Sequence, residues 1–220
     1  EAARAEALAP FDVLCLMRER MKLPAELIHR LGALRLIVTT GRRNAAIDLA
    51  AARARGVTVC GTDSRPASTA HLAMTLILAG LRHLPQETGS MARGGWQAAA
   101  GRDLEGLTLG LVGLGRIGAA VAALARAFGA EILAWSENLT EARCAEAGAV
   151  HAGSLAALLE RSDAVSLHLV LSERTRGLIG AAELARMKPD ALLVNTSRAQ
   201  LVDVAALRAA LHAGRPGMAA

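Results

Sequence analysis

The stretch GLTLGLVGLGRIG, residues 106–118, limits most strongly what this chain can fold into. An apolar run typical of a buried strand leads into Gly113, Gly115 and Gly118, and a helical pattern follows them. This spacing, between a strand and a helix, is that of turns that bind the pyrophosphate of a dinucleotide. Gly113 would allow the sharp turn, Gly115 would let backbone N–H groups approach the phosphates, and Gly118 would let the helix pack close to the sheet. A glycine-rich turn that binds no ligand is the alternative.

Short β-like runs alternate with helical runs on both sides of this turn, over residues 11–60 and 107–213. Strands that alternate with helices form parallel sheets, so the pattern predicts an α/β fold with a doubly wound sheet around the glycines. A long helix is predicted from the spacing of Ala70, Ala73, Met74, Ile77, Leu78 and Leu81. The Gly/polar stretch at 90–106 suggests a domain crossing, and we place the boundary between residues 78 and 79.

Composition excludes several classes of protein. The formal charge is +5, but the basic residues are scattered arginines with two lysines and few aromatics, so we expect no nucleic-acid partner. The most apolar helical stretch, 70–84, carries His71, Arg82 and His83, so we expect no membrane insertion. The three cysteines are far apart and lack metal-ligand spacing, which predicts no disulfide framework, no metal site and a reducing cytoplasm.

The residues after the second strand of the nucleotide fold usually decide which dinucleotide binds. Counting on from the glycines reaches Ser136, where a ribose-binding carboxylate usually stands, and then Glu137. Ser136 alone would leave room for a 2′-phosphate, whereas Glu137 would repel one if it turns inward. The choice between NAD and NADP is open, and we predict a modest preference for NAD(H) over NADP(H).

Five stretches together resemble the D-isomer-specific 2-hydroxyacid dehydrogenase family. They are TTGRRNAAIDLAAARARGVTVCGT, GLTLGLVGLGRIG, VSLHLVLSERTRGLIG, ELARMKPDALLVNTSRAQLVD and ALRAALHAGRPG. The resemblance implies a Rossmann dinucleotide-binding domain, here residues 79–220, and an incomplete flavodoxin-like substrate domain, residues 1–78. It also implies an oxidoreductase that transfers a hydride between a nicotinamide cofactor and a small 2-keto acid or D-2-hydroxy acid.

An arginine, Arg198, stands directly after the strand-like run ALLVNTS. A lone arginine at a strand end is often a solvated cap or a surface ion pair. The resemblance implies instead that Arg198 faces the substrate as a catalytic residue. A planar guanidinium can bind a carboxylate with two parallel hydrogen bonds while it polarises the neighbouring 2-keto oxygen.

The resemblance assigns further positions. Gly41, Arg42 and Arg43 match a loop that holds the substrate carboxylate, although Arg43 replaces a glycine of the family. Val170 stands where the family usually has Pro. Besides the three glycines, Ser136 and Glu137, the cofactor-binding positions are Thr69, Arg116, Ile117, His168, Leu169, Val170, Ser172, Thr196 and Ser197.

Family members use a histidine as general base, and a glutamate orients it. Both follow the segment that AGRPGMAA resembles, so we expect them beyond Ala220, and none of the six histidines is assigned to the role. We further expect a cytoplasmic homodimer. The alternatives are a regulator that senses NAD(H), like the corepressors related to this family, and an inactive fragment.

Overall fold

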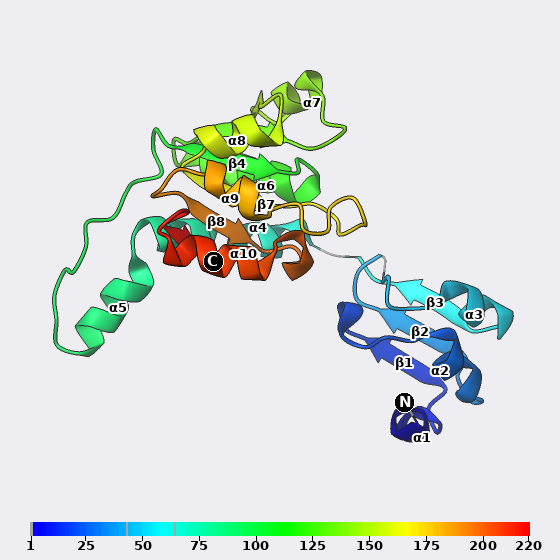
Figure 1. Ribbon diagram of the computed structural model, residues 1–220. Helices are drawn as coiled ribbons and strands as arrows, with labels where there is room; N and C mark the ends of the chain where they lie inside the picture. Colours follow the sequence, from blue (N-terminus) through cyan, green and yellow to red (C-terminus); the bar gives the residue numbers. More distant parts are fainter. Residues whose placement is uncertain (1, 43, 64) are drawn as a thin grey trace. The chain divides into compact units, whose positions relative to one another are not determined.

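The computed structural model describes residues 2–42, 44–63 and 65–220. The chain forms two compact units, residues 1–65 and 66–220. Each unit has its own parallel sheet (Figure 1). The division lies earlier in the chain than the boundary between residues 78 and 79 that the sequence suggested.

The first unit is a three-stranded parallel sheet in the order β1-β2-β3. Its elements are α1 (Ala2–Leu8), β1 (Val13–Leu16), the 3-10 turn η1 (Arg18–Arg20), α2 (Ala25–Arg30), β2 (Leu36–Thr39), α3 (Leu49–Ala54) and β3 (Thr58–Gly61). Because side chains alternate along a strand, Leu14, Leu16 and Ile37 share one face, and the buried residues of α1, α2 and α3 form one core with them. The other face carries Cys15, Val38 and Cys60 in one register row, and both cysteines are exposed.

The second unit is a six-stranded parallel sheet in the order β6-β5-β4-β7-β8-β9. Its elements are α4 (Pro66–Leu81), α5 (Leu84–Ala92), β4 (Thr108–Val112), α6 (Arg116–Ala127), β5 (Glu131–Trp135), α7 (Glu141–Glu146), β6 (Val150–His151), α8 (Leu155–Arg161), β7 (Ala164–Leu167), α9 (Ala181–Arg186), β8 (Leu192–Asn195), η2 (Ala199–Leu201), α10 (Val204–His212) and β9 (Met218–Ala219). The order moves outward from β4 in both directions, which is the topology of a doubly wound sheet.

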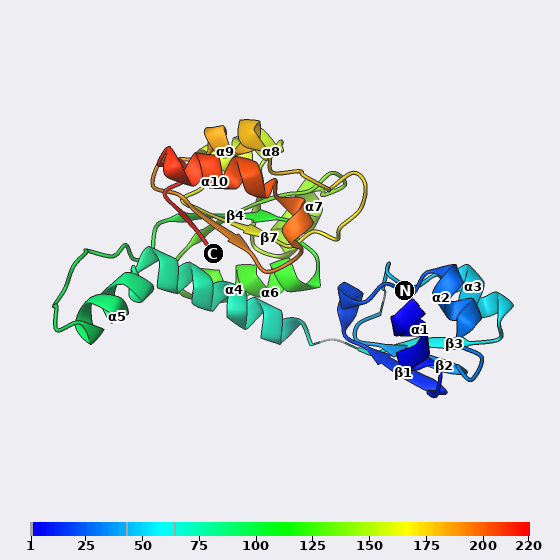
Figure 2. The ribbon, with the colours of Figure 1, turned by 60° about the horizontal axis from the view of Figure 1, so that its bottom comes forward.

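Helices cover both faces of this sheet (Figure 2). Leu109 and Leu111 of β4 lie in the core beneath α4 and α6. Val112 of β4 and Leu133 of β5 lie in the opposite core, with α8, α9 and α10. Central parallel strands buried on both faces read as continuous apolar runs, which is why β4, β7 and β8 are visible in the sequence. The α/β class and the Rossmann arrangement predicted from the sequence are confirmed.

The long helix predicted over residues 70–81 is α4, and it belongs to the second unit. Five of the six residues that predicted it are buried, and they share one core with α6 and the strands. The unit boundary precedes α4 because this apolar face packs on the six-stranded sheet rather than in the first unit.

The Gly/polar stretch interpreted as a crossing is an arm of the second unit. The chain leaves the body of that unit after Leu81, forms α5, and returns at Arg102, whose amide donates to the carbonyl of Leu81 (2.8 Å) (Figure 1). Arg82 and Asp103 close the base of the arm with an ion pair at 2.6 Å. No residue of α5 is buried among the residues that the structure describes.

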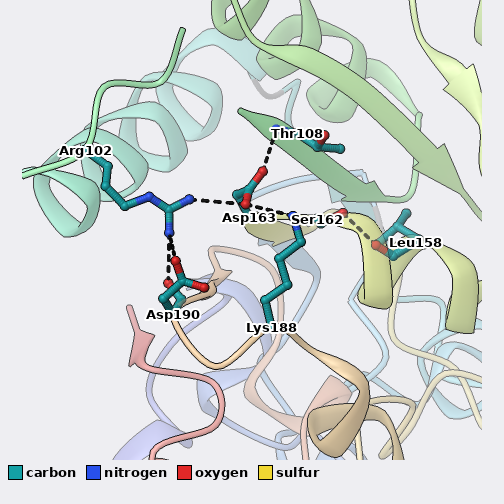
Figure 3. A network of polar contacts seen from close by, with 7 residues as sticks. All are labelled: Arg102, Thr108, Leu158, Ser162, Asp163, Lys188 and Asp190. Carbon is teal, nitrogen blue, oxygen red and sulfur yellow. Dashed lines mark hydrogen bonds and ion pairs between the residues drawn. The ribbon is translucent and has the colours of Figure 1, made fainter. Parts of the chain in front are cut away.

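A polar network joins the amino-terminal ends of the strands (Figure 3). Asp163, just before β7, accepts from the amide of Thr108 (2.9 Å) and pairs with Lys188 (2.8 Å) and Arg102 (3.2 Å). Arg102 also pairs with Asp190. Burial alone would raise the pKa of Asp163, but the bonds from Lys188 and Thr108 and the charges of Lys188 and Arg102 outweigh burial and hold it below the ordinary value.

None of the helices in the described part of the chain combines the length and the apolar character that a membrane crossing requires.

Candidate functional site

A cavity of about 510 Å³ lies at the carboxyl ends of β5, β4 and β7 in the second unit. Three segments line it: the turn at 113–115 after β4, residues 135–139 at the end of β5, and residues between 168 and 178 after β7. Because β4 lies between β5 and β7, the turn sits between the other two segments. Ligands of open α/β sheets bind at this edge, and the volume is within the range of small-molecule sites, roughly 300–1,000 Å³.

Two of the three glycines are required by the packing of the chain itself. Gly113 has φ +105°, and a Cβ there would lie 2.9 Å from the carbonyl carbon and oxygen of His168. A Cβ on Gly118 would lie 2.2 Å from the carbonyl oxygen of Gly113, so α6 can pack on the turn only without one. The amide of Gly113 donates to Trp135 (2.8 Å), which fixes the turn to β5.

Gly115 is different, because nothing in the described chain requires a glycine there. It has φ −77°, which any residue adopts, and an added Cβ would meet no atom within 4 Å. The residue is exposed at the cavity and is the N-cap of α6, whose first N–H groups have no partner within the helix. A Cβ at Gly115 would fill the space that a phosphate needs to reach these groups, so the turn fits a dinucleotide.

His168 forms part of the cavity wall directly behind the turn. Its amide donates to Val112 (2.8 Å), and burial lowers the pKa of its imidazole to about 4, so the ring is neutral near pH 7. Both ring nitrogens, and Oγ1 of Thr196 after β8, are buried without a hydrogen-bond partner among the described residues. Buried polar atoms normally have partners, so these atoms mark places where a ligand or water can bind.

The loop after β7 is held by a compact turn. Oγ1 of Thr175 donates to the carbonyl of Val170 (2.8 Å) and accepts from the amide of Ser172 (2.8 Å). The amide of Arg176 donates to the carbonyl of Ser172 (3.0 Å). This turn fixes the backbone on both sides of Arg174, which is one of the residues that line the cavity.

Comparison with known proteins assigns this fold and site to a family. A family model described as D-isomer specific 2-hydroxyacid dehydrogenase, NAD binding domain, matches residues 74–220. The chain belongs to the D-isomer-specific 2-hydroxyacid dehydrogenase family. Residues 74–220 are therefore its NAD-binding domain, which confirms the resemblance inferred from the sequence.

Individual dehydrogenases of this family match most of the chain. A D-3-phosphoglycerate dehydrogenase from Methanocaldococcus jannaschii is 35% identical over 213 residues, which cover 96% of this chain and 40% of that protein. The crystal structure of a phosphoglycerate oxidoreductase from Vibrio cholerae matches with a TM-score of 0.91 and 38% identity, over 99% of this chain and 70% of that one. The crystal structure of a D-lactate dehydrogenase from Aquifex aeolicus, complexed with NAD and lactic acid, matches with a TM-score of 0.82 and 30% identity. The match covers 96% of this chain and 64% of that one. The chain thus spans two fifths of the length of the archaeal dehydrogenase.

The structure brings many of the predicted cofactor residues of this dehydrogenase family together at the cavity. Those that line it are Gly113, Gly115, Ser136, Glu137, His168, Leu169, Val170 and Ser172. Arg116, Ile117 and Gly118 lie beside it, in the first turn of α6. Thr69 lies in the first turns of α4, and Thr196 and Ser197 follow β8.

Arg198 follows a turn that Asn195 organises. The side chain of Asn195 donates to the carbonyl of Arg198 (2.9 Å) and accepts from the amide of Ser197 (3.0 Å). Oγ of Ser197 donates to the carbonyl of Leu167 (2.7 Å), which ties the turn to β7. The half-buried Arg198 donates from Nη1 to the carbonyl of Ser197 (3.2 Å) and is the N-cap of η2, near the carboxyl end of β8.

The predicted substrate loop belongs to the first unit. The amide of Gly41, which has φ +91°, donates to Oγ1 of Thr62 (3.1 Å), and Arg42 forms an exposed pair with Asp63 at 2.7 Å. The amide of Gly41 and the guanidinium of Arg42 thus have partners inside their own unit. Arg43 lies outside the described residues.

The sequence missed several residues of the cavity wall: Leu114, Trp135, Asn138, Leu139, Arg174, Thr175 and Leu178. For Thr175 a signal exists, because Ser172 and Thr175 stand three residues apart in a polar loop, a spacing typical of hydrogen-bonded turns. For Arg174 the charge was visible, but its position at the cavity depends on how the loop folds.

Proposed function

We propose that this chain is part of an NAD(H)-dependent oxidoreductase that transfers a hydride between the cofactor and C2 of a small 2-keto acid or D-2-hydroxy acid. The observation that supports it most is Gly115, an exposed glycine that neither φ nor packing explains, at the N-terminus of α6 in an NAD-binding domain. The relatives with this fold include a phosphoglycerate oxidoreductase and a lactate dehydrogenase.

The residues around the cavity would divide the work of holding the cofactor. The turn at Gly113 and Gly115 and the amides of Arg116 and Ile117 would bind the pyrophosphate, and Ser136 would bind the adenosine ribose. His168 to Ser172 would form the wall on the adenosine side. The bound nicotinamide would donate or accept the hydride. Thr69, Thr196 and Ser197 stay predicted cofactor contacts.

We assign Arg198 to the substrate, with the loop of Gly41 and Arg42 as a further proposed carboxylate site. In the protein that contains this chain, Arg198→Lys should lower kcat/KM by about two orders of magnitude, roughly 2.7 kcal/mol, because lysine keeps the charge but lacks the two-pronged geometry. The affinity for NADH should stay nearly unchanged. Steady-state kinetics and NADH titration test this, with Arg208→Lys on the exposed side of α10 as control. Wild-type turnover by Arg198→Lys would reject the assignment.

For the cofactor we propose a modest preference for NADH over NADPH. Glu137 lines the cavity beside Ser136, and a carboxylate near a 2′-phosphate adds repulsion on the order of 1 kcal/mol at the dielectric of water. Glu137→Gln should therefore reduce the NADH advantage when both cofactors are titrated. Unchanged affinities in this variant would remove Glu137 as its cause.

We further propose a cytoplasmic homodimer that uses the α5 arm. Leu84, Met91 and Trp96 of the arm are 54%, 57% and 78% exposed, and large apolar side chains left exposed on one segment can mark a protein interface. Sedimentation equilibrium should give about twice the chain mass of 22.8 kDa, and Trp96→Glu should shift it toward the monomer. The cysteines of the chain are free, as a reducing compartment would leave them.

A further inference from the structure

We propose that Arg174 binds the 2′-phosphate of NADP(H) and so keeps this site open to both dinucleotides. The inference rests on the proposed function, because it requires a dinucleotide in the cavity. Arg174 lies in the cavity wall after β7, whereas Ser136 and Glu137, from which the sequence predicts cofactor choice, lie in the wall after β5.

The cavity has one charged side chain on each side of the glycine turn. Among the residues that line it, Glu137 and Arg174 alone carry a formal charge near pH 7, since His168 is neutral. Glu137 follows β5 and Arg174 follows β7, and these strands flank β4 and its turn. A phosphate on the ribose beside Ser136 would therefore lie in a cavity that contains one anion and one cation.

Arg174 has no structural task in the described part of the chain. Neither Arg174 nor Glu137 takes part in any of the ion pairs found among the described residues, and the side chain of Arg174 forms none of the hydrogen bonds found there. Other arginines do have acidic partners: Arg42, Arg82, Arg102, Arg143 and Arg186. Arg174 is exposed at the cavity and is available to an anionic ligand.

The backbone that carries Arg174 is already ordered. Thr175 and Ser172 hold the turn through bonds at 2.8 Å and 3.1 Å, and Arg174 lies between them in the chain. Binding would then order only the arginine side chain, whose planar fork matches the oxygens of a phosphate. Because Glu137 and Arg174 act with opposite signs, we expect the affinities for NADH and NADPH to differ by no more than about tenfold.

The test titrates NADH and NADPH by calorimetry against the wild-type chain, Arg174→Gln and Arg176→Gln. Arg176 is the matched control, because it has the same charge, is exposed in the same loop and does not line the cavity. We expect Arg174→Gln to lower the affinity for NADPH about fivefold or more and the affinity for NADH less than twofold. Arg176→Gln should change neither affinity. The loss should shrink at high salt, because ions screen exposed charges. Adenosine 2′,5′-bisphosphate and 5′-AMP, which differ by the 2′-phosphate, should repeat the contrast.

The outcomes separate the two proposals. An unchanged ratio of NADPH to NADH affinity in Arg174→Gln, or an equal loss in Arg176→Gln, overturns the role of Arg174 while the dinucleotide site stands. Failure of the wild-type chain to bind either dinucleotide rejects the site itself, and the inference with it.

Discussion

At the scale of single residues, Gly115 and Gly118 show that one residue type can serve two purposes in the same turn. Gly118 is needed because a Cβ would lie 2.2 Å from a backbone oxygen of the same chain. Gly115 has open space around it, so we attribute the need for a glycine at this position to the ligand that the turn binds. The motif alone cannot separate these roles, whereas the surroundings of each glycine can.

The two alanine variants should therefore behave in opposite ways. Gly118→Ala should lower the free energy of unfolding by a few kcal/mol, because backbone atoms must move apart. Gly115→Ala should keep the Tm within about 2 °C of wild type. It should lower the affinity for NADH about tenfold or more, which corresponds to a loss of about 1.4 kcal/mol in binding free energy. Thermal unfolding and calorimetric titration give both quantities. NADH affinity at the wild-type level in Gly115→Ala would contradict the assigned role.

Most of the cavity was predictable where a residue lies next to a strand end in sequence. The glycines, Ser136 and Glu137 follow β4 and β5 directly, so counting along the chain reached them. Arg174 stands seven positions after the end of β7, and its place depends on the turn at Thr175. No periodicity encodes such a turn, which is why Arg174 was missed although His168 to Ser172 of the same wall were predicted.

At the scale of elements, the network around Asp163 holds together the amino-terminal ends of strands whose carboxyl ends form the cavity. The side chain of Asp163 is 14% exposed and contacts β4 through Thr108 and the loop before β8 through Lys188. It sits at the far edge of the sheet from the glycine turn, so its loss should affect stability rather than cofactor contacts.

Asp163→Asn should lower the free energy of unfolding at pH 7 by about 1–3 kcal/mol, because it leaves Lys188 and Arg102 without their shared carboxylate. The folded-state pKa of Asp163 lies below its unfolded value. The contribution is thus complete above the unfolded value, about 3.9, and is lost as the pH falls through the folded value. Urea unfolding from pH 7 to pH 3 should show the gap to wild type closing. Asp190→Asn is the control and should lower the free energy of unfolding less, because the Arg102–Asp190 pair is more exposed. A stability difference between Asp163→Asn and wild type that does not change with pH would contradict the mechanism.

Element types were easier to predict than their partners. The apolar spacing of α4 was correct at Ala70, Ala73, Met74, Ile77 and Leu81. The spacing did not show which unit the helix packs in, because it shows that a face is buried but not against what. Similarly, the arm at 82–103 has the composition of a linker, and only its closure by Arg82 and Asp103 shows that it returns to the same unit.

At the scale of the whole molecule, the described residues form three buried cores, one in the first unit and two in the second, and no buried side chain belongs to more than one of them. Ile77 of α4 and Ile37 of β2 are both fully buried, one in each unit. They provide a matched pair for testing where the units divide.

Ile77→Ala and Ile37→Ala should each cost about 2–5 kcal/mol, because each leaves a cavity in a close-packed core. In native-state hydrogen exchange, Ile77→Ala should lower amide protection within residues 66–220 and leave β1–β3 as in wild type. Ile37→Ala should do the reverse. If Ile77→Ala weakens β1–β3 as well, the boundary at Arg65 is not an energetic one.

The row of Cys15, Val38 and Cys60 on the exposed face of the first sheet has a consequence for oxidative chemistry. Cys15 lies on β1 and Cys60 on β3, with β2 between them. Because neighbouring strands are about 4.8 Å apart, the Cα atoms of the two cysteines are separated by roughly 10 Å. A disulfide needs Cα atoms within about 7 Å, and one sheet therefore cannot join its own pair. Cys144 is buried, and burial raises the pKa of its thiol, which keeps it unreactive. Oxidation should instead link Cys15 or Cys60 of one molecule to another, and two such sites per chain allow linear or ring-shaped covalent polymers in air.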